Sequence, residues 1–157
     1  MRLYQEPDVA ARAGDPTLSR LGYLVKRVQA ALRASMDEAF RPVGLSVSQY
    51  AILEALAETP ESEATNVAIA RRCFITPQSA NEIIAAMTES RLVSRRSSAG
   101  TRRISFSLTK RGRDKCIEGR RLSLEIEKRM LSGQTKEDRE RLADLLIRCA
   151  RSLEDSP

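Results

Sequence analysis

Four polar side chains follow the dipeptide Thr76-Pro77 within a stretch of five residues. They are Gln78, Ser79, Asn81 and Glu82. Amides and hydroxyls donate and accept hydrogen bonds and a carboxylate accepts them, so this set can pair with the edges of nucleic-acid bases. Thr76 offers a hydroxyl N-cap and Pro77 suits the first position of a helix. The sequence therefore predicts a helix that begins here, with these polar groups on its exposed N-terminal side and Ile83, Ile84 and Met87 buried.

Arginines flank this predicted helix. The segment from Arg71 to Arg121 holds 13 Lys or Arg and four acidic residues, whereas the rest of the chain holds 14 basic and 17 acidic residues. The arginines that we expect to contact a polyanion are Arg71, Arg72, Arg95, Arg96, Arg102 and Arg103. Such a concentration of positive charge is typical of a surface that binds a polyanion. A basic face that only keeps the protein in solution is the alternative.

The chain lacks the residues of most catalytic and metal sites. It contains no histidine, its three cysteines are far apart, and it has neither a nucleophile motif nor a glycine-rich phosphate loop. We therefore expect no catalytic residue, no metal and no cofactor, and we expect that the protein is not an enzyme. Cys73, Cys116 and Cys149 fall on predicted helices, which favours inert packing over a redox role without deciding between them.

A second short helix is predicted just before Thr76. The segment NVAIARR follows Thr65, which can cap it, and Val67, Ile69 and Ala70 occupy the expected inward positions. The tight turn RRCFITPQ joins this helix to the next one, as in a helix-turn-helix. In that motif the first helix braces the second, whose N-terminal turn enters the major groove of duplex DNA. Phosphates would meet the helix start and the neighbouring Arg71, Arg72 and Thr76.

The segments LVSRRS and RRISFSL flank the flexible stretch SSAGT and predict a β-hairpin. In the second segment Ile104, Phe106 and Leu108 alternate with polar residues. Four arginines lie near the tip of this hairpin, and the narrow minor groove of DNA attracts guanidinium groups. The helix-turn-helix and this wing together predict a protein that binds duplex DNA.

Longer helices are predicted around this lobe. After the turn RPVGLS, Ser46 or Ser48 can cap a core helix that contains Tyr50, Ile52, Leu53 and Leu56. Residues 18–40 and the segment after Thr135 each carry one apolar stripe, and residues 109–131 predict a long charged helix between them. The last stripe consists of Leu142, Leu145, Leu146, Cys149 and Leu153. Because an exposed apolar stripe favours association, we expect a partner to cover both ends of the chain.

The length and composition predict one mainly α domain over residues 1–157 with a small β-hairpin wing. Residues 1–16 form a loose arm, residues 47–108 the winged helix-turn-helix lobe, and residues 17–41 and 109–155 the N- and C-terminal dimerisation helices. No apolar run approaches the length of a membrane-spanning helix or of a signal peptide core, so we expect a cytoplasmic protein with no membrane partner.

Three segments carry a resemblance to a known family. They are LGYLVKRVQAALRASMDEAFRPVGLSVSQYAILEALAE, ATNVAIARRCFITPQSANEIIAAM, and the pair RLVSRR with RRISFSLTKRGR. This pattern, from Leu18 to Gly119, resembles the MarR (multiple antibiotic resistance regulator) family. The resemblance implies a homodimer whose first and last helices interlock, two winged lobes on a pseudo-palindromic operator, and a role as a repressor released by a small molecule.

The resemblance also assigns roles by position. It implies that Gln78, Ser79, Asn81 and Glu82 contact bases, that Thr76 contacts a phosphate and that Arg102 is the wing arginine. Two departures matter. Gly100 stands where many relatives carry an acid that orients this arginine, so Arg103 can share its role, and Glu82 stands where many relatives carry a basic residue.

Family members often bind an aromatic or phenolic effector between the dimerisation helices and the DNA-binding lobe. In this chain the candidate lining residues are Tyr23, Arg27, Phe40 and Tyr50, although a plain packing or surface position is the favoured explanation of both tyrosines. A winged helix that binds RNA or another protein, without effector control, is the alternative function. The scarcity of aromatic residues for stacking argues against RNA.

Overall fold

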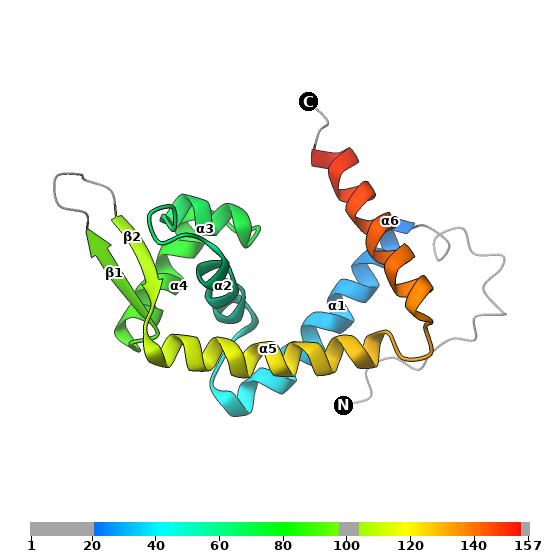
Figure 1. Ribbon diagram of the computed structural model, residues 1–157, viewed down its shortest axis with the longest axis horizontal. Coiled ribbons are helices and arrows are strands. Elements are labelled where there is room, and N and C mark those ends of the chain that lie inside the picture. The colour runs from blue at the N-terminus through cyan, green and yellow to red at the C-terminus, as the bar shows by residue number, and fades with distance from the viewer. Residues whose placement is uncertain (1–20, 98–103, 155–157) are drawn as a thin grey trace.

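The computed structural model describes residues 21–97 and 104–154, which form a helical protein with one antiparallel hairpin (Figure 1). The long helices are α1 (Leu21–Phe40), α5 (Lys110–Met130) and α6 (Lys136–Glu154), and a short 3-10 turn, Arg41–Val43, follows α1. The shorter elements are α2 (Val47–Glu58), α3 (Asn66–Arg72), α4 (Pro77–Glu89), β1 (Val93–Ser97) and β2 (Ile104–Leu108). This order confirms the predicted helix-turn-helix, hairpin and flanking long helices.

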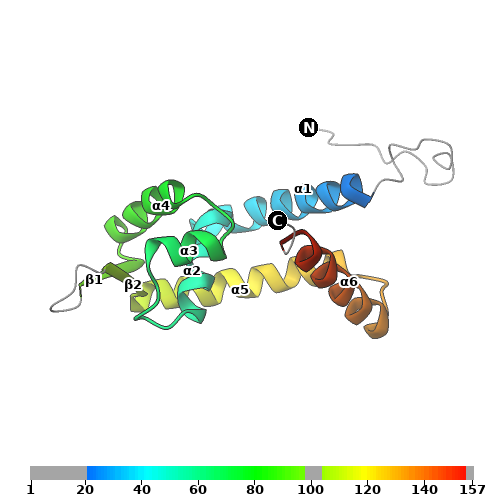
Figure 2. The same ribbon diagram turned by 90° about the horizontal axis from the view of Figure 1, so that it is seen from above.

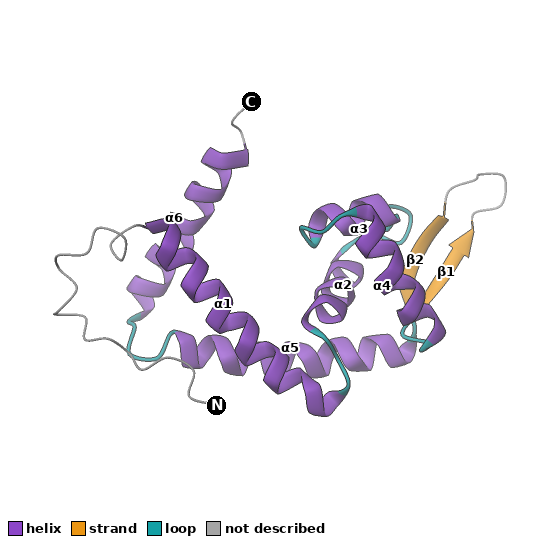
Figure 3. Ribbon diagram, turned by 180° about the vertical axis from the view of Figure 1, so that it is seen from behind, coloured by secondary structure: helices purple, strands orange, loops and turns teal. Residues whose placement is uncertain are grey.

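The core lies in the lobe made by α2, α3, α4 and the hairpin. Its largest fully buried side chains are Phe40, Ile52, Leu53, Ile69, Ile84, Met87 and Val93. Strands β1 and β2 pair from Val93 opposite Leu108 to Ser97 opposite Ile104. The Phe106 amide also donates to the Ala64 carbonyl at 2.9 Å, which joins the hairpin to the start of α3. In Figure 3, seen from behind, α4 and the hairpin lie side by side at one end of the molecule.

Hydroxyl caps begin five of the described helices, and only the cap at Thr109 was not predicted from the sequence. Ser46, rather than Ser48, caps α2 through a reciprocal capping box with Gln49. Thr65, Thr76 and Thr109 accept hydrogen bonds from the first turns of α3, α4 and α5. Thr135 accepts from the Asp138 amide at 3.1 Å at the start of α6. Local side-chain chemistry therefore fixes where these helices begin.

Two glycines let α5 approach the lobe closely. A Cβ atom at Gly112 would lie 2.0 Å from the Leu92 carbonyl oxygen, and one at Gly119 would lie 2.5 Å from the Tyr50 ring. The Thr109 hydroxyl donates to the Arg91 carbonyl at 2.7 Å and fixes the start of α5 below the hairpin. These contacts join the base of the lobe to the long helix that leaves it.

The two ends of the chain are packed very differently from the lobe. Every residue of α6 is exposed, and Phe40 is the only buried residue of α1. Figures 1 and 2 show α1 and α6 extending away from the lobe beside the far end of α5. The predicted stripe of α6 is therefore uncovered in one chain, as expected for a surface that awaits a partner. No helix in the described ranges is both long and apolar enough to span a membrane.

One inward position was predicted wrongly. Val67 is 65% exposed, whereas Ile69 and Ala70 are buried as expected. At about 100° per residue, Val67 lies roughly 160° around the α3 axis from Ile69, so the two cannot share one narrow face. The positions that share the side of Ile69 are those three and four residues away, Asn66 and Cys73, and both are half-buried.

Candidate DNA-binding interface

The N-terminus of α4 is held by a compact hydroxyl cap. Thr76 Oγ1 accepts from the Ser79 amide at 3.1 Å and donates to Ser79 Oγ at 2.9 Å. Asn66 of α3 donates from Nδ2 to the Pro77 carbonyl at 2.8 Å and so fixes the angle between the two helices. Thr76 remains exposed at the helix start. Ser79 is half-buried, and its hydroxyl accepts a hydrogen bond from Thr76 within the cap.

One exposed stripe runs along α4. Its members are Pro77, Gln78, Asn81, Glu82, Ala85, Ala86 and Glu89. Gln78 donates from Nε2 to Glu82 Oε1 at 3.3 Å across one turn of the helix. The structure thus places Gln78, Asn81 and Glu82 together on one open face, and the small alanines beyond them allow close approach to another surface.

The two described arginines of the hairpin face opposite sides of it. Arg95 lines a hollow of about 420 Å³ together with Asn81 and Thr88 of α4. Arg96, the next residue of β1, instead forms an ion pair from Nε to Glu61 Oε1 at 2.8 Å. Successive strand residues point to opposite faces, so the alternation of β1 could have separated the two arginines in advance. Only Arg95 shares a surface with the exposed stripe of α4.

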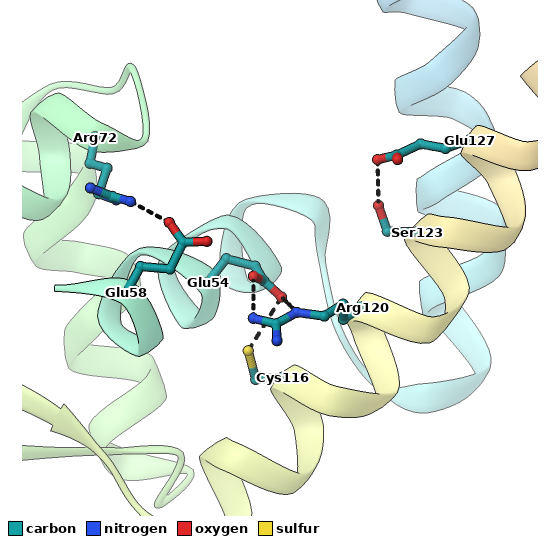
Figure 4. Close-up of polar contacts among 7 residues, drawn as sticks. All are labelled: Glu54, Glu58, Arg72, Cys116, Arg120, Ser123 and Glu127. Carbon is teal, nitrogen blue, oxygen red and sulfur yellow. Dashed lines mark hydrogen bonds and ion pairs between the residues drawn. The ribbon is translucent and has the colours of Figure 1, made fainter. Parts of the chain in front are cut away.

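The two arginines of α3 are both exposed and line one hollow with Val67 and Phe74, but they differ in ion pairing. The Arg72 guanidinium forms an ion pair with Glu58 at the end of α2 (Figure 4). Arg71 forms no ion pair with a described residue. Phe74, in the turn between α3 and α4, is 87% exposed and has a left-handed φ of 55°. Phe74 was not among the site residues predicted from the sequence. An aromatic residue in so tight a turn could have indicated an exposed side chain.

Two of the proposed wing residues, Arg102 and Arg103, lie outside the described residues. Gly100, on which the departure from the family pattern depends, lies in the same segment. Among the described residues, the candidate interface therefore comprises the α4 stripe, Thr76, Arg71 and Arg95.

The four candidate effector residues are not gathered at one place in a single chain. Phe40 is completely buried, and its ring packs edge-on against Tyr50 with centroids 5.0 Å apart. Tyr23 and Arg27 lie on the exposed part of α1. At 1.5 Å per residue, Tyr23 is about 25 Å from Phe40 along the helix. The structure therefore places Phe40 and Tyr50 as packing neighbours, apart from Tyr23 and Arg27.

A polar cluster that sequence reasoning missed joins α2 of the lobe to α5. Arg120 donates from Nη2 to Glu54 Oε2 at 2.7 Å and from Nε to Glu54 Oε1 at 3.1 Å. The Cys116 thiol donates to the same carboxylate at 3.4 Å (Figure 4). The two charged residues are 66 positions apart, so no local pattern could have paired them.

Burial and charge set the protonation of this cluster. Burial opposes ionisation of Glu54, but hydrogen bonds from Arg120, Cys116 and Tyr50 outweigh it and lower the pKa of the carboxyl group. Burial and the neighbouring carboxylate raise the pKa of Cys116 to about 11 and that of Tyr50 to about 12. Near neutral pH the cluster therefore holds a carboxylate, a guanidinium and two neutral donors.

Comparison with known proteins gives a consistent family. The model of the MarR family matches residues 43–104, which cover α2, α3, α4 and β1 and end at the first residue of β2. The HTH-type transcriptional repressor Rv2887 of Mycobacterium tuberculosis is 33% identical over 94 residues, which are 59% of this chain and 66% of the relative. The matched region thus spans about two thirds of the length of that curated relative.

Solved structures extend the likeness to the long helices. The M. tuberculosis MarR family protein Rv2887 in complex with p-aminosalicylic acid aligns with a TM-score of 0.70 and 26% identity, covering 84% of this chain and 99% of that one. Its complex with DNA aligns with a TM-score of 0.68 and 24% identity, covering 83% and 98% of the two chains. On this sequence match and this shared architecture, the chain belongs to the MarR family.

Proposed function

We propose that the chain is a sequence-specific transcription repressor that binds duplex DNA as a homodimer and is released by a small molecule. The observation that carries this proposal is the open face formed by Gln78, Asn81 and Glu82 at the capped start of α4, with Arg95 across an adjoining hollow. A helix start with amide and carboxylate side chains fits the major groove, and a neighbouring cation fits the phosphates. Arg102 and Arg103 would add the contacts of the wing tip.

The proposed homodimer depends on the uncovered apolar stripes of α1 and α6, the two helices that we call the arms of the chain. Leu142, Leu145 and Leu146 of α6 are each at least 40% exposed, as are Leu24, Val25 and Val28 of α1. Burying such stripes against a second copy contributes about 25 cal/mol for each Å² of apolar surface. A symmetric pair would present two α4 helices to successive major grooves, which requires a pseudo-palindromic operator.

The effector that we propose is a small aromatic or phenolic acid. The support is the relative Rv2887, whose structure was solved in complex with p-aminosalicylic acid. Tyr23 and Arg27 of α1 are proposed contacts, because a hydroxyphenyl ring and a guanidinium suit such a ligand. Phe40 and Tyr50 are left out of the proposed contacts, because Phe40 is completely buried and lies about 25 Å along α1 from Tyr23. Because the target is genomic duplex, we propose that the protein works in the cytoplasm.

RNA binding is the second candidate, and Phe74 is the observation that favours it. An exposed aromatic ring near Arg71 can stack on an unpaired base. Phe106 of the hairpin, in contrast, is buried and offers no stacking surface.

A gel shift at matched salt separates the two candidates. We expect the full chain to retard duplex fragments from the host genome and to bind unstructured RNA of equal length more weakly. Salicylate added to the duplex complex should release the protein. Preference for RNA would remove the proposed function, and duplex binding that no aromatic acid weakens would remove only the effector.

A further inference from the structure

The exposed face of α4 carries negative charge and no positive charge. The helix sequence PQSANEIIAAMTE contains Glu82 and Glu89 but neither Lys nor Arg. Duplex DNA carries one negative charge per 1.7 Å of its axis, so a carboxylate that approaches it without a donor is repelled. If α4 enters the major groove as proposed above, Glu82 must therefore meet a hydrogen-bond donor on a base.

Glu82 is available for such a contact. Among the described residues, Glu54, Glu58 and Glu61 each form an ion pair with an arginine, whereas Glu82 forms none. Its described partner is Gln78 Nε2, at 3.3 Å from Glu82 Oε1. A carboxylate only accepts hydrogen bonds, so Gln78 must turn its amide nitrogen toward it. This contact steadies the carboxylate and leaves the second oxygen of Glu82 as an acceptor.

The chemistry of the bases then singles out one partner. Guanine presents two acceptors in the major groove, and thymine presents an acceptor and a methyl group. Adenine has a donor at N6, but the acceptor N7 beside it repels a second carboxylate oxygen. On its own ring, cytosine presents the N4 amino group beside a C–H group, so a carboxylate that approaches from that side meets a donor and no acceptor. We propose that Glu82 selects a cytosine in each half of the operator, an inference that rests on the proposed binding of duplex DNA.

The test is selection from a pool of random-sequence duplex oligonucleotides by the full-length protein. Wild type should enrich an operator that contains a cytosine at one position of each half-site. Replacing that cytosine should weaken binding by at least about fivefold. Glu82→Ala should abolish the preference at that position alone, and Glu82→Gln should shift it toward adenine, because an amide both donates and accepts.

Glu89→Gln is the matched control. It removes one carboxylate from the same exposed stripe two turns further along α4. We expect it to change affinity uniformly across operator variants, with every selected base unchanged. Thermal unfolding of the variants should match wild type, because both side chains are exposed.

The outcomes separate this inference from the proposed function. If Glu82→Ala raises the affinity equally for all sequences, as we expect of Glu89→Gln, then Glu82 acts only through its charge. That result would overturn the inference. The same holds if the base whose preference changes in Glu82→Ala is not a cytosine. Failure of wild type to enrich any duplex would instead overturn the proposed function, and the inference with it.

Discussion

The lobe and the arms of this chain use apolar residues at similar helical spacing but bury them very differently. In α2, Ile52, Leu53 and Leu56 are all buried against neighbouring elements of the same chain. In α6, Leu142, Leu145 and Leu146 repeat at comparable spacing and each remains more than 40% exposed. The difference teaches that the lobe completes its core within one chain, whereas the apolar stripes of α1 and α6 remain uncovered in one chain and would be buried in the proposed dimer. DNA binding would then depend on two surfaces that form at different levels of assembly.

Breaking the arm surface should have the largest effect. The double variant Leu145→Glu, Leu146→Glu places two charges in the α6 stripe and should yield monomers. Loss of the second half-site contact should weaken operator binding by on the order of 100-fold or more, because two linked contacts bind far better than one. Sedimentation and gel shifts measure the two effects. Arg151→Glu, on the opposite face of α6, is the control and should remain dimeric. A double variant that still dimerises would contradict the proposed interface.

Breaking the link between lobe and arm should have the next largest effect. Glu54→Gln removes the charge that pairs with Arg120 and should lower the free energy of unfolding by about 1–2 kcal/mol at neutral pH. The pKa of Glu54 is lowered in the folded protein, so its stabilisation is present above the ordinary pKa of a carboxyl group and is lost as pH falls through the folded value. The difference between wild type and variant should therefore shrink in acid, as measured by urea unfolding between pH 7 and pH 3.

Glu125→Gln is the matched control for that experiment. Glu125 also pairs with an arginine of α5, Arg121, but across one exposed turn of the same helix at 2.7 Å. Such a pair contributes only about 0.5 kcal/mol. If both variants lower the free energy of unfolding equally, the pair of Glu54 with Arg120 stabilises the protein no more than an exposed pair within one helix.

Within the lobe, the two neighbouring arginines of β1 should differ. Arg95→Ala should weaken operator binding by about 1 kcal/mol and reduce its salt dependence by about one counterion, because Arg95 shares a hollow with the α4 stripe. Arg96→Ala should change binding little, because Arg96 is paired with Glu61 on the other face. Gel shifts across a salt series measure both. A larger loss for Arg96→Ala would reverse the proposed orientation of the hairpin.

The smallest expected effect is a difference in thiol reactivity between the lobe side of α5 and the α6 stripe. Cys116 is buried and its pKa is raised to about 11, so iodoacetamide at pH 8 should leave it unmodified in folded protein. Cys149 is exposed in one chain but lies on the α6 stripe. Its labelling should slow as protein concentration rises and dimers form, which mass spectrometry can follow. If the rate of Cys149 labelling does not depend on protein concentration, Cys149 lies outside the proposed dimer interface.

Much of the fold could be predicted because its signals are local. Ser46, Thr65, Thr76, Thr109 and Thr135 each cap a helix through a contact with a residue three positions away, which a sequence displays directly. The alternation of β2 likewise indicates the hairpin. Within the site, the same local logic identified the helix start and the polar face of α4.

Contacts between distant segments could not be predicted. The pairing of Glu54 with Arg120 and of Arg96 with Glu61 depends on how the lobe packs against α5 and on which side of the hairpin faces the loop before α3. The exposure of Val67, in contrast, follows from helix periodicity and could have been predicted. These pairings decide which arginines remain open to a ligand, so charge counting named more candidates than the structure leaves available.

The central claim is that two copies of this chain place two α4 helices on one duplex. Sedimentation equilibrium of the protein with an operator duplex selected in vitro tests it directly. We expect a free protein of twice the 17.5 kDa of one chain and a complex that contains two chains for each duplex. A single chain on each duplex, bound as tightly to half an operator as to a whole one, would contradict the claim.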